Sequence, residues 1–315
     1  MDRLESLITL PPRPADGHKG TFGTALIVGG CAGRTRMIGA PALAARAAAR
    51  AGAGLTRVLA PEPIVDHVLA LAPHATAVAI ETHDDGTLIG QSAIAALDEQ
   101  LQHAQSVVIG PGLGAGETSK TLVLRAVGQE DVAAVVDADA INALVKVAEF
   151  WREIRGQIIF TPHPGEFRRL AQALGLSFEL RDADSRIDAA GEMARRLGAI
   201  VVLKGAHTVV SDGQRYWVCG SACACLATGG TGDVLAGLLA GLIAQYPASA
   251  SDILMAKTGR PQKPTLFELA CVAVEAHARA GERWAELHGA DAGLLPMELA
   301  DLLPGVLQEL RLSKK

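Results

Sequence analysis

Aromatic residues are scarce in this sequence, which has six Phe, three Trp and two Tyr among 315 residues. The core must therefore be filled mainly by Ala, Val, Leu and Ile, and hydrophobic residues make up 49% of the chain. This composition excludes a disordered chain, and the 34 glycines follow no strict period, which excludes a collagen-like chain. A ligand site is expected to rely on backbone dipoles and a few polar side chains rather than on stacking.

Neither sign of charge dominates, because 34 acidic and 29 basic residues leave a net charge of −5. Nucleic acid is therefore not an expected partner. The cysteines are five in number, and an odd count does not fit a secreted framework of paired disulfides; they are Cys31, Cys219, Cys223, Cys225 and Cys271.

Long hydrophobic runs are also missing. The longest stretch without a charged residue, from Val234 to Ser251, is interrupted after Ala244 by Gln-Tyr-Pro, and its apolar part is too short to span a bilayer. The first ten residues mix charges with Leu and lack the apolar core of a signal peptide. We expect no membrane association and a cytoplasmic location.

Short apolar runs alternate with helical patterns from Thr21 onward. The runs are continuous in Val and Ile, which is typical of strands covered by helices on both faces. The expected strands are 25–28, 55–60, 77–80, 106–109, 133–136, 158–160 and 200–203, with a hairpin of 208–211 and 215–218; the expected helices are 38–51, 61–71, 91–103, 118–127, 138–150 and 184–197. This order predicts a mostly parallel central sheet in a three-layer α/β/α sandwich. We expect one domain over residues 1–315, with a loop insertion at about 247–264 between two C-terminal helices.

Glycines gather where predicted strands end, which is where open α/β sheets bind ligands. One cluster, from Gly29 to Gly33, is by itself no more than a tight turn. A second, from Gly110 to Gly116, matches the dinucleotide pattern G-x-G-x-x-A in letters, but it lies mid-chain and holds a proline inside the turn. A hydride-transferring Rossmann site is therefore discounted. A Walker A loop is excluded too, because Ser precedes Lys120 where that motif needs Gly.

The most informative cluster is Ala-Thr-Gly-Gly-Thr-Gly-Asp at 227–233, directly before an apolar helix. Glycines before a helix expose backbone N–H groups whose partial positive charge suits a phosphate or a developing anion. Asp233 could accept a proton from a substrate hydroxyl, or it could merely stabilise the first turn of the helix. Three glycines and two threonines beside it exceed what a cap requires and favour chemistry. Within the helix, Gly237 and Gly241 predict close packing rather than a membrane dimer.

Three other segments follow predicted strands and should reach the same edge of the sheet. His163 lies between two prolines, which suits a ligand contact, although an ordinary surface loop is the alternative. Lys204 comes directly after an apolar strand, where it can meet a phosphate as a point charge. The segment from Asp137 to Asn142 either places substrate hydroxyls or a hydrated Mg²⁺, or caps the next helix.

The spacing Cys219-x-x-x-Cys223-x-Cys225 invites a zinc interpretation. No fourth ligand follows at a standard spacing, and the segment is otherwise small and apolar. Buried free thiols are predicted instead.

Taken in order, these motifs resemble the ADP-dependent NAD(P)H-hydrate dehydratase family. Single motifs are modest, but eight in the right order over about 19–311 are specific. They are Lys19-Gly20-x-x-Gly23, Gly29-Gly30, Gly39-Ala40-Pro41, Gly110-Pro111-Gly112-Leu113-Gly114, Asp137-Ala138-Asp139-Ala140, Thr161-Pro162-His163-Pro164-Gly165-Glu166-Phe167, Lys204-Gly205-Ala206 and Ala227-Thr228-Gly229-Gly230-Thr231-Gly232-Asp233. The family has a ribokinase-like fold, which agrees with the predicted sheet. Many relatives carry an N-terminal epimerase domain, for which this chain is expected to be too short.

The resemblance implies a carbon–oxygen lyase that repairs nicotinamide cofactors. The 6S epimer of NADH hydrate or NADPH hydrate would be dehydrated at the expense of ADP, with ATP as the less favoured donor, and AMP and phosphate would be released. Mg²⁺ is expected with the nucleotide, although no metal ligand is assigned. A homo-oligomer is also expected, with a tetramer as one candidate.

The resemblance also assigns residues to three roles. The hydrated cofactor would contact Ala40, Gly112, Gly114, His163 and Asp233. The adenine nucleotide would contact Lys204, Gly205, Ala206, His207, Thr208 and Gly232. The catalytic set would be Asp233, which takes the proton of the C6 hydroxyl, with N–H groups that stabilise the transferring phosphoryl group, from Gly230, Thr231 and Gly232.

Two alternatives stay open. A ribokinase-like vitamin or sugar kinase would share the glycine–aspartate site but release a stable phosphoester. Segments 110–114 and 161–166 argue against it, because a small alcohol needs fewer contacts than a dinucleotide. A nucleotide-sensing module would keep the pocket without turnover, and the presence of both Lys204 and Asp233 argues against that loss.

Overall fold

The computed structural model describes residues 1–247 and 263–312, and its centre is one extended sheet. All neighbouring strands run parallel except β11, which is antiparallel to both of its neighbours. The strand order is β1 (Asp2–Arg3), β12 (Arg215–Val218), β11 (Val209–Ser211), β10 (Ile200–Leu203), β9 (Ile158–Phe160), β8 (Ala133–Val136), β7 (Ser106–Ile109), β2 (Thr24–Val28), β5 (Leu55–Pro61) and β6 (Thr76–Ile80). The mostly parallel sheet predicted from continuous apolar runs is confirmed.

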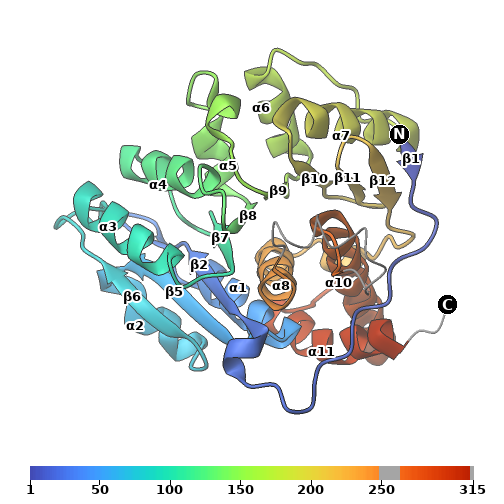
Figure 1. Cartoon of the computed structure of the whole chain (residues 1–315), viewed down its shortest axis with the longest axis horizontal. Helices are drawn as coiled ribbons and strands as arrows, with labels where there is room; N and C mark the ends of the chain where they lie inside the picture. Colours follow the sequence, from blue (N-terminus) through green and yellow to red (C-terminus); the bar gives the residue numbers. More distant parts are fainter. Residues whose placement is uncertain (248–262, 313–315) are drawn as a thin grey trace.

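Helices cover both faces of this sheet, which gives the predicted three layers (Figure 1). Side chains alternate along each strand, so Ile27 joins the core on one face and Leu26 the core on the other. The first face is covered by α1 (Gly39–Ala51), α2 (Glu62–Leu71), α8 (Thr231–Gln245), α10 (Leu266–His288) and α11 (Pro296–Leu312). The second is covered by α3 (Gly90–Leu101), α4 (Glu117–Val127), α5 (Asp139–Leu144), α6 (Pro164–Ala173) and α7 (Ala183–Leu197).

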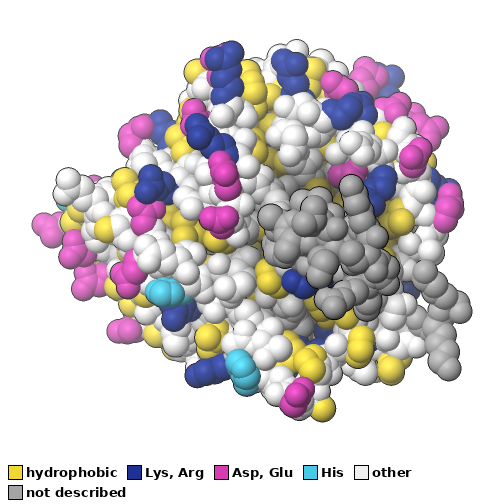
Figure 2. Space-filling model, in the orientation of Figure 1, with side chains coloured by type: hydrophobic (Ala, Val, Ile, Leu, Met, Phe, Trp, Pro, Cys, Tyr) yellow, Lys and Arg dark blue, Asp and Glu magenta, His cyan; other side chains and the backbone are white. Residues whose placement is uncertain are grey.

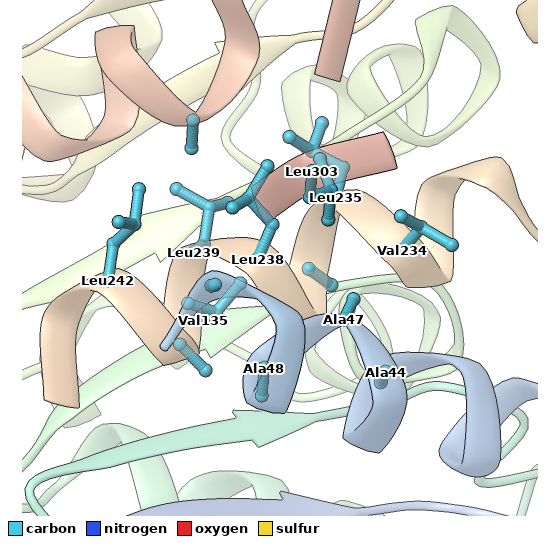
Figure 3. Packing of buried hydrophobic residues seen from close by; sticks show 14 of the residues in the cluster. Ala44, Ala47, Ala48, Val135, Val234, Leu235, Leu238, Leu239, Leu242 and Leu303 are labelled. Atoms are coloured by element: carbon cyan, nitrogen blue, oxygen red, sulfur yellow. The ribbon is translucent and has the colours of Figure 1, made fainter. Parts of the chain in front are cut away.

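Helices α1 and α8 lie side by side at the middle of the first face, and their contact depends on residues without bulk. Figure 3 shows Ala44, Ala47 and Ala48 of α1 beneath the leucines of α8. A Cβ atom on Gly237 would collide with the backbone of Ala44, and one on Gly241 with the backbone of Ala48. The prediction that these two glycines mark close helix packing is confirmed, since any side chain would force the two backbones apart.

Local structure departs from the sequence prediction at one helix. The helix expected over 138–150 is wrong in extent, because α5 ends at Leu144 and a short 3₁₀ helix, η2 (Phe150–Glu153), follows. The chain tightens there into turns in which Lys146 N–H donates to Ala143 O and Val147 N–H to Leu144 O. β-Branched Val145 and Val147 are weak helix formers, which the apolar pattern did not reveal.

Other differences are small additions. The hairpin about Asp212-Gly213 is confirmed as β11 and β12. Two strand pairings were not predicted: the short β1 beside β12, and a two-stranded ribbon of β3 (Cys31–Ala32) with β4 (Arg36–Met37). Residues 248–262 of the predicted 247–264 insertion lie outside the described residues.

Neither a membrane-spanning helix nor an extended basic surface is found in the part of the protein that the structure describes and Figure 2 shows. Within 1–247 and 263–312, no helix combines the length and apolarity needed to cross a bilayer. Figure 2 shows acidic and basic side chains interspersed over one face, without an extended basic region.

Candidate active site

Loops that follow four adjacent parallel strands meet at the carboxyl edge of the sheet. β7 leads into the glycine loop at 110–116, β8 into Asp137, β9 into Thr161 and β10 into Lys204. Because β7 to β10 are neighbours in this order, these groups stand in a row. The N-terminus of α8 points at the same edge, so segments far apart in sequence share one site.

The centre of the row is a buried ion pair. Lys204 Nζ lies 2.8 Å from Asp137 Oδ1, and the Thr161 hydroxyl donates to the same oxygen at 2.6 Å. Asp137 is 1% exposed. Burial alone would lower the pKa of Lys204, but the carboxylates of Asp137 and Glu166 outweigh it, and the pKa is raised. Lys204 is therefore a fixed positive charge at the floor of the site.

Asp233 lies in the first turn of α8, above that charge. The turn is entered through Gly230 with φ +96, a backbone conformation that favours glycine. A Cβ atom on Gly232 would lie 3.4 Å from Lys204 Nζ, so the lysine stands against the helix N-terminus. Among the described residues, the Asp233 carboxylate has no hydrogen-bond partner. Burial, reinforced by repulsion from Asp137, raises its pKa to about 7 despite the attraction of Lys204.

The loop after β7 forms the other side of the site. Gly112 and Gly114 have φ of +62 and +74, and the Gly114 N–H donates to Asp139 Oδ2 at 2.9 Å. A Cβ atom on Gly112 would lie 2.7 Å from Met37 Cβ and 3.3 Å from Ala40 Cβ. The structure thus brings together Ala40, Gly112 and Gly114, three of the residues predicted to touch the cofactor.

His163 lies at the edge of the site and caps α6. The ring Nδ1 of His163 accepts from the Gly165 N–H at 3.0 Å, while the backbone N–H of His163 donates to Glu166 Oε2 at 2.9 Å. The His163 side chain is 51% exposed, so the ring faces solvent beside the row. Burial raises the pKa of Glu166, with Lys204 acting in the opposite direction. The sequence pattern did not show that this histidine also has a structural task.

A cavity of about 450 Å³ opens beside Lys204 and the N-terminus of α8. Five residues predicted to bind nucleotide line it: Lys204, Gly205, Ala206, Thr208 and Gly232. The sixth, His207, is not among the lining residues; it has φ +53, and its Nδ1 lies 3.2 Å from Cys219 O. The remaining walls are mostly apolar and were not predicted; they include Cys219, Cys223, Leu226, Leu235, Val274 and His277.

His277 is the most informative of the residues that were missed. It belongs to α10, and its Nε2 lies 2.9 Å from the carbonyl oxygen of Thr231, which accepts, so Nε2 carries the proton. Burial lowers its pKa to about 4. A neutral histidine therefore ties α10 to the first turn of α8, and no local motif around residue 277 could have indicated it.

Two more features complete the site. A second cavity of about 290 Å³ adjoins Gly114 and Asp139, and Lys120 and Lys146 also line it. Over the described ranges, no group of three or more His, Cys, Asp or Glu side chains is placed to hold a metal ion. One oxygen of each nearby carboxylate already has a partner: Asp137 Oδ1 accepts from Lys204 and Thr161, and Asp139 Oδ2 accepts from the Gly114 N–H.

The comparison that decides the family is the match of residues 25–305 to the NAD(P)H-hydrate dehydratase family model. This chain belongs to the NAD(P)H-hydrate dehydratase family. The resemblance inferred from the motifs is therefore confirmed, and so is the ribokinase-like fold.

Individual relatives of the family agree with this assignment. The bifunctional NAD(P)H-hydrate repair enzyme Nnr of Thermofilum pendens is 35% identical over 306 residues, which is 96% of this chain and 53% of that protein. The chain thus spans about half the length of the first curated relatives it matches. The ADP-dependent (S)-NAD(P)H-hydrate dehydratase of Bacillus subtilis is 33% identical, over 95% of this chain and 94% of that protein.

A solved structure of a family member is similar as well. The ADP/ATP-dependent NAD(P)H-hydrate dehydratase from Bacillus subtilis, co-crystallised with ATP and Mg²⁺, has a TM-score of 0.72 and 30% identity, and the match covers 96% of this chain and 95% of that one. The family's fold therefore extends over nearly the whole chain.

Proposed function

We propose that this chain dehydrates the 6S epimers of NADH hydrate and NADPH hydrate at the expense of ADP, and releases AMP and phosphate. The observation that carries the proposal is Asp233, a carboxylate without a hydrogen-bond partner among the described residues, with a pKa of about 7. It is close enough to interact electrostatically with Lys204, which lines the 450 Å³ cavity, and with Asp139, which accepts from the Gly114 N–H on the other side of the site. A base in that place can serve a substrate on one side and a phosphoryl donor on the other.

The nucleotide is assigned to the 450 Å³ cavity. Its base would occupy the apolar walls, and its phosphates would meet Lys204 and the N–H groups at the start of α8. Lys204 keeps its charge at neutral pH, because Asp137 and Glu166 raise its pKa above the ordinary value. This part of the site thus neutralises charge on the donor without moving.

The hydrated nicotinamide ring is assigned to the side of Ala40, Gly112 and Gly114. Glycine at 112 leaves the ring room that a side chain would fill. The 290 Å³ cavity continues from Gly114 and offers Lys120 and Lys146 to the rest of the dinucleotide. His163 lies at the rim of this path.

The reaction then follows in two steps. Asp233 takes the proton of the C6 hydroxyl while the oxygen of that hydroxyl attacks the β-phosphorus of ADP, and AMP departs. The ring nitrogen next donates its electron pair and expels phosphate from C6, and a proton is lost from C5 to restore the dihydropyridine. The backbone N–H groups of Gly230, Thr231 and Gly232 face the charge that develops on the phosphoryl group.

Mg²⁺ remains a prediction from the sequence. Within the described residues, no three His, Cys, Asp or Glu side chains are grouped so that they could hold a cation, and one oxygen each of Asp137 and Asp139 already has a partner. An ion would therefore have to be held largely by the nucleotide phosphates and water, and no step above depends on it. A homo-oligomeric state and a cytoplasmic location also stay predictions.

One assay separates this function from its alternatives. The protein is incubated with NADH hydrate and either ADP or ATP, and the recovery of NADH absorbance is followed together with free phosphate. Recovery in step with phosphate supports the dehydratase. A stable phosphoester would instead identify a kinase, and binding of nucleotide without turnover would identify a sensor.

A further inference from the structure

Two cysteines that the proposed reaction does not use lie together in the wall of the larger cavity. Cys223 Sγ and Cys225 Sγ are 3.0 Å apart. Cys223 is half-buried and lines the cavity, whereas Cys225, in the short helix η3 (Ala224–Leu226), is 1% exposed. The Cys225 thiol donates to the carbonyl oxygen of Gly281 at 3.3 Å. The Cys223 thiol is therefore reachable from the cavity, whereas the Cys225 thiol is buried next to it.

The spacing is short enough for a covalent bond. A disulfide joins sulfurs at about 2.05 Å, so the two atoms need to approach by about 1 Å. The exposed Ala222 and Ala224 flank Cys223 and offer little steric resistance to such a shift. Both cysteines are free thiols in the structure.

We propose that peroxide converts Cys223 and Cys225 into a reversible disulfide, and that this modification weakens nucleotide binding in the cavity that Cys223 lines. The first half stands on the geometry of the thiols alone. The second half rests on the proposed function, because it takes the cavity to be the nucleotide site.

The chemistry balances with hydrogen peroxide as the oxidant. The Cys223 thiol releases its proton and the thiolate attacks one peroxide oxygen. The O–O bond breaks, the hydroxide that leaves takes up the released proton, and Cys223 sulfenic acid and water form. Cys225 Sγ then attacks Cys223 Sγ, and the S–O bond breaks. The hydroxide that leaves takes the Cys225 proton and becomes a second water. Burial and the neighbouring thiol raise the pKa of Cys225 to about 12, so Cys225 stays protonated and Cys223, which lines the cavity, is the thiol that reacts with peroxide first.

The link to nucleotide binding is geometric. Cys223 shares the cavity wall with Leu226, which follows Cys225 directly in the chain. Formation of the disulfide would move the segment from Cys223 to Leu226 relative to Val274 and His277 of α10, which line the same cavity. A bound nucleotide should in turn disfavour the disulfide at equilibrium, because linkage requires that each event oppose the other by the same factor. A nucleotide in the cavity should also cover Cys223 and slow its reaction with peroxide.

The bond itself is tested by thiol counting and peptide mapping of the full chain before and after peroxide. The wild type should lose two of its five thiols, and dithiothreitol should restore them. Cys223→Ser and Cys225→Ala should form no disulfide, whereas Cys31→Ser, which removes a half-buried thiol outside this cavity, should form it as the wild type does. A map that joins Cys219 to Cys223, or irreversible oxidation of Cys223 alone, would overturn the proposal.

The regulatory half is tested by ADP binding to the reduced and the oxidised wild type. Oxidation should weaken ADP binding about fivefold or more, and saturating ADP should slow thiol loss. Equal affinities would refute it. If the reduced protein binds no ADP, the proposed function and this half fail together, while the peptide map still decides the first half.

Discussion

Replacing Asp233 by Asn should make this protein more stable while it removes activity. The carboxylate is half-buried near Asp137, and these surroundings raise its pKa from 3.8 to about 7. The fold therefore disfavours the ionised form that a general base needs. An amide of the same shape is neutral at every pH and escapes that cost.

The sign follows from the raised pKa. As the pH rises above 3.8, the unfolded chain releases this proton before the folded one does, so Asp233 lowers the free energy of unfolding progressively up to pH 7. The shift corresponds to about 4 kcal/mol as an upper bound, at 1.36 kcal/mol per pKa unit. Because a buried amide has a desolvation cost of its own, the expected gain for the variant at pH 8.5 is about 1–3 kcal/mol.

The assay is urea unfolding of the wild type and of Asp233→Asn at pH 8.5 and pH 5. The advantage of the variant should fall to less than half at the lower pH, and His277 does not disturb the comparison because both proteins contain it. Turnover should drop by about 10²-fold to 10⁴-fold while ADP still binds. In the wild type, kcat should rise with pH through an apparent pKa near 7. A variant that is less stable at pH 8.5, or that retains normal turnover, would refute this reasoning.

Three further predictions concern the surroundings of Asp233. Lys204→Ala should weaken ADP binding about tenfold or more, and unchanged affinity by calorimetry would contradict the assigned role. The same change should lower the free energy of unfolding by about 3 kcal/mol, because Asp137 loses its buried counter-charge. Gly112→Ala should raise KM for the hydrated cofactor and leave ADP affinity unchanged. Gly175→Ala is the control, because Gly175 has a similar positive φ with open space around it and so reports backbone strain alone. Equal KM values for the two variants in steady-state kinetics would argue against the assignment. Burial lowers the pKa of His277 to about 4, so the contribution of this residue to the free energy of unfolding should fall between pH 6.5 and 4. The stability difference between the wild type and His277→Gln should therefore shift in favour of the variant over that range, and a constant difference would contradict this.

Much of the fold could be predicted because local signals and long-range order agree. Continuous apolar runs such as 106–109 can only be strands buried on both faces, and glycines mark the points where they end. The helix over 138–150 was wrong because the apolar pattern continues past Leu144, while the backbone at Val145 and Val147 does not remain helical. The pattern reports burial, and burial alone does not fix the backbone.

The candidate site divides in the same way. Asp233 and Lys204 were found because each follows an element end that the sequence shows. The cavity walls that α10 supplies were not predicted, because His277 reaches the site only through tertiary packing and has no motif around it. His207 was carried along with its neighbours, although the loop turns its ring toward Cys219 O. Contiguity in sequence predicts a loop, but not which of its side chains face the ligand.

The contact between α1 and α8 has a consequence for how the reactants are aligned. The two helices run in the same direction, with Gly237 against Ala44 and Gly241 against Ala48. Extended by one turn toward the N-termini, the same register would pair Ala40 with Asp233. The proposed cofactor contact at Ala40 and the proposed base at Asp233 are therefore spaced by two backbones in direct contact, rather than by flexible loops. A methyl group added at Gly237 would act as a spacer, and would change the reacting distance without touching either substrate.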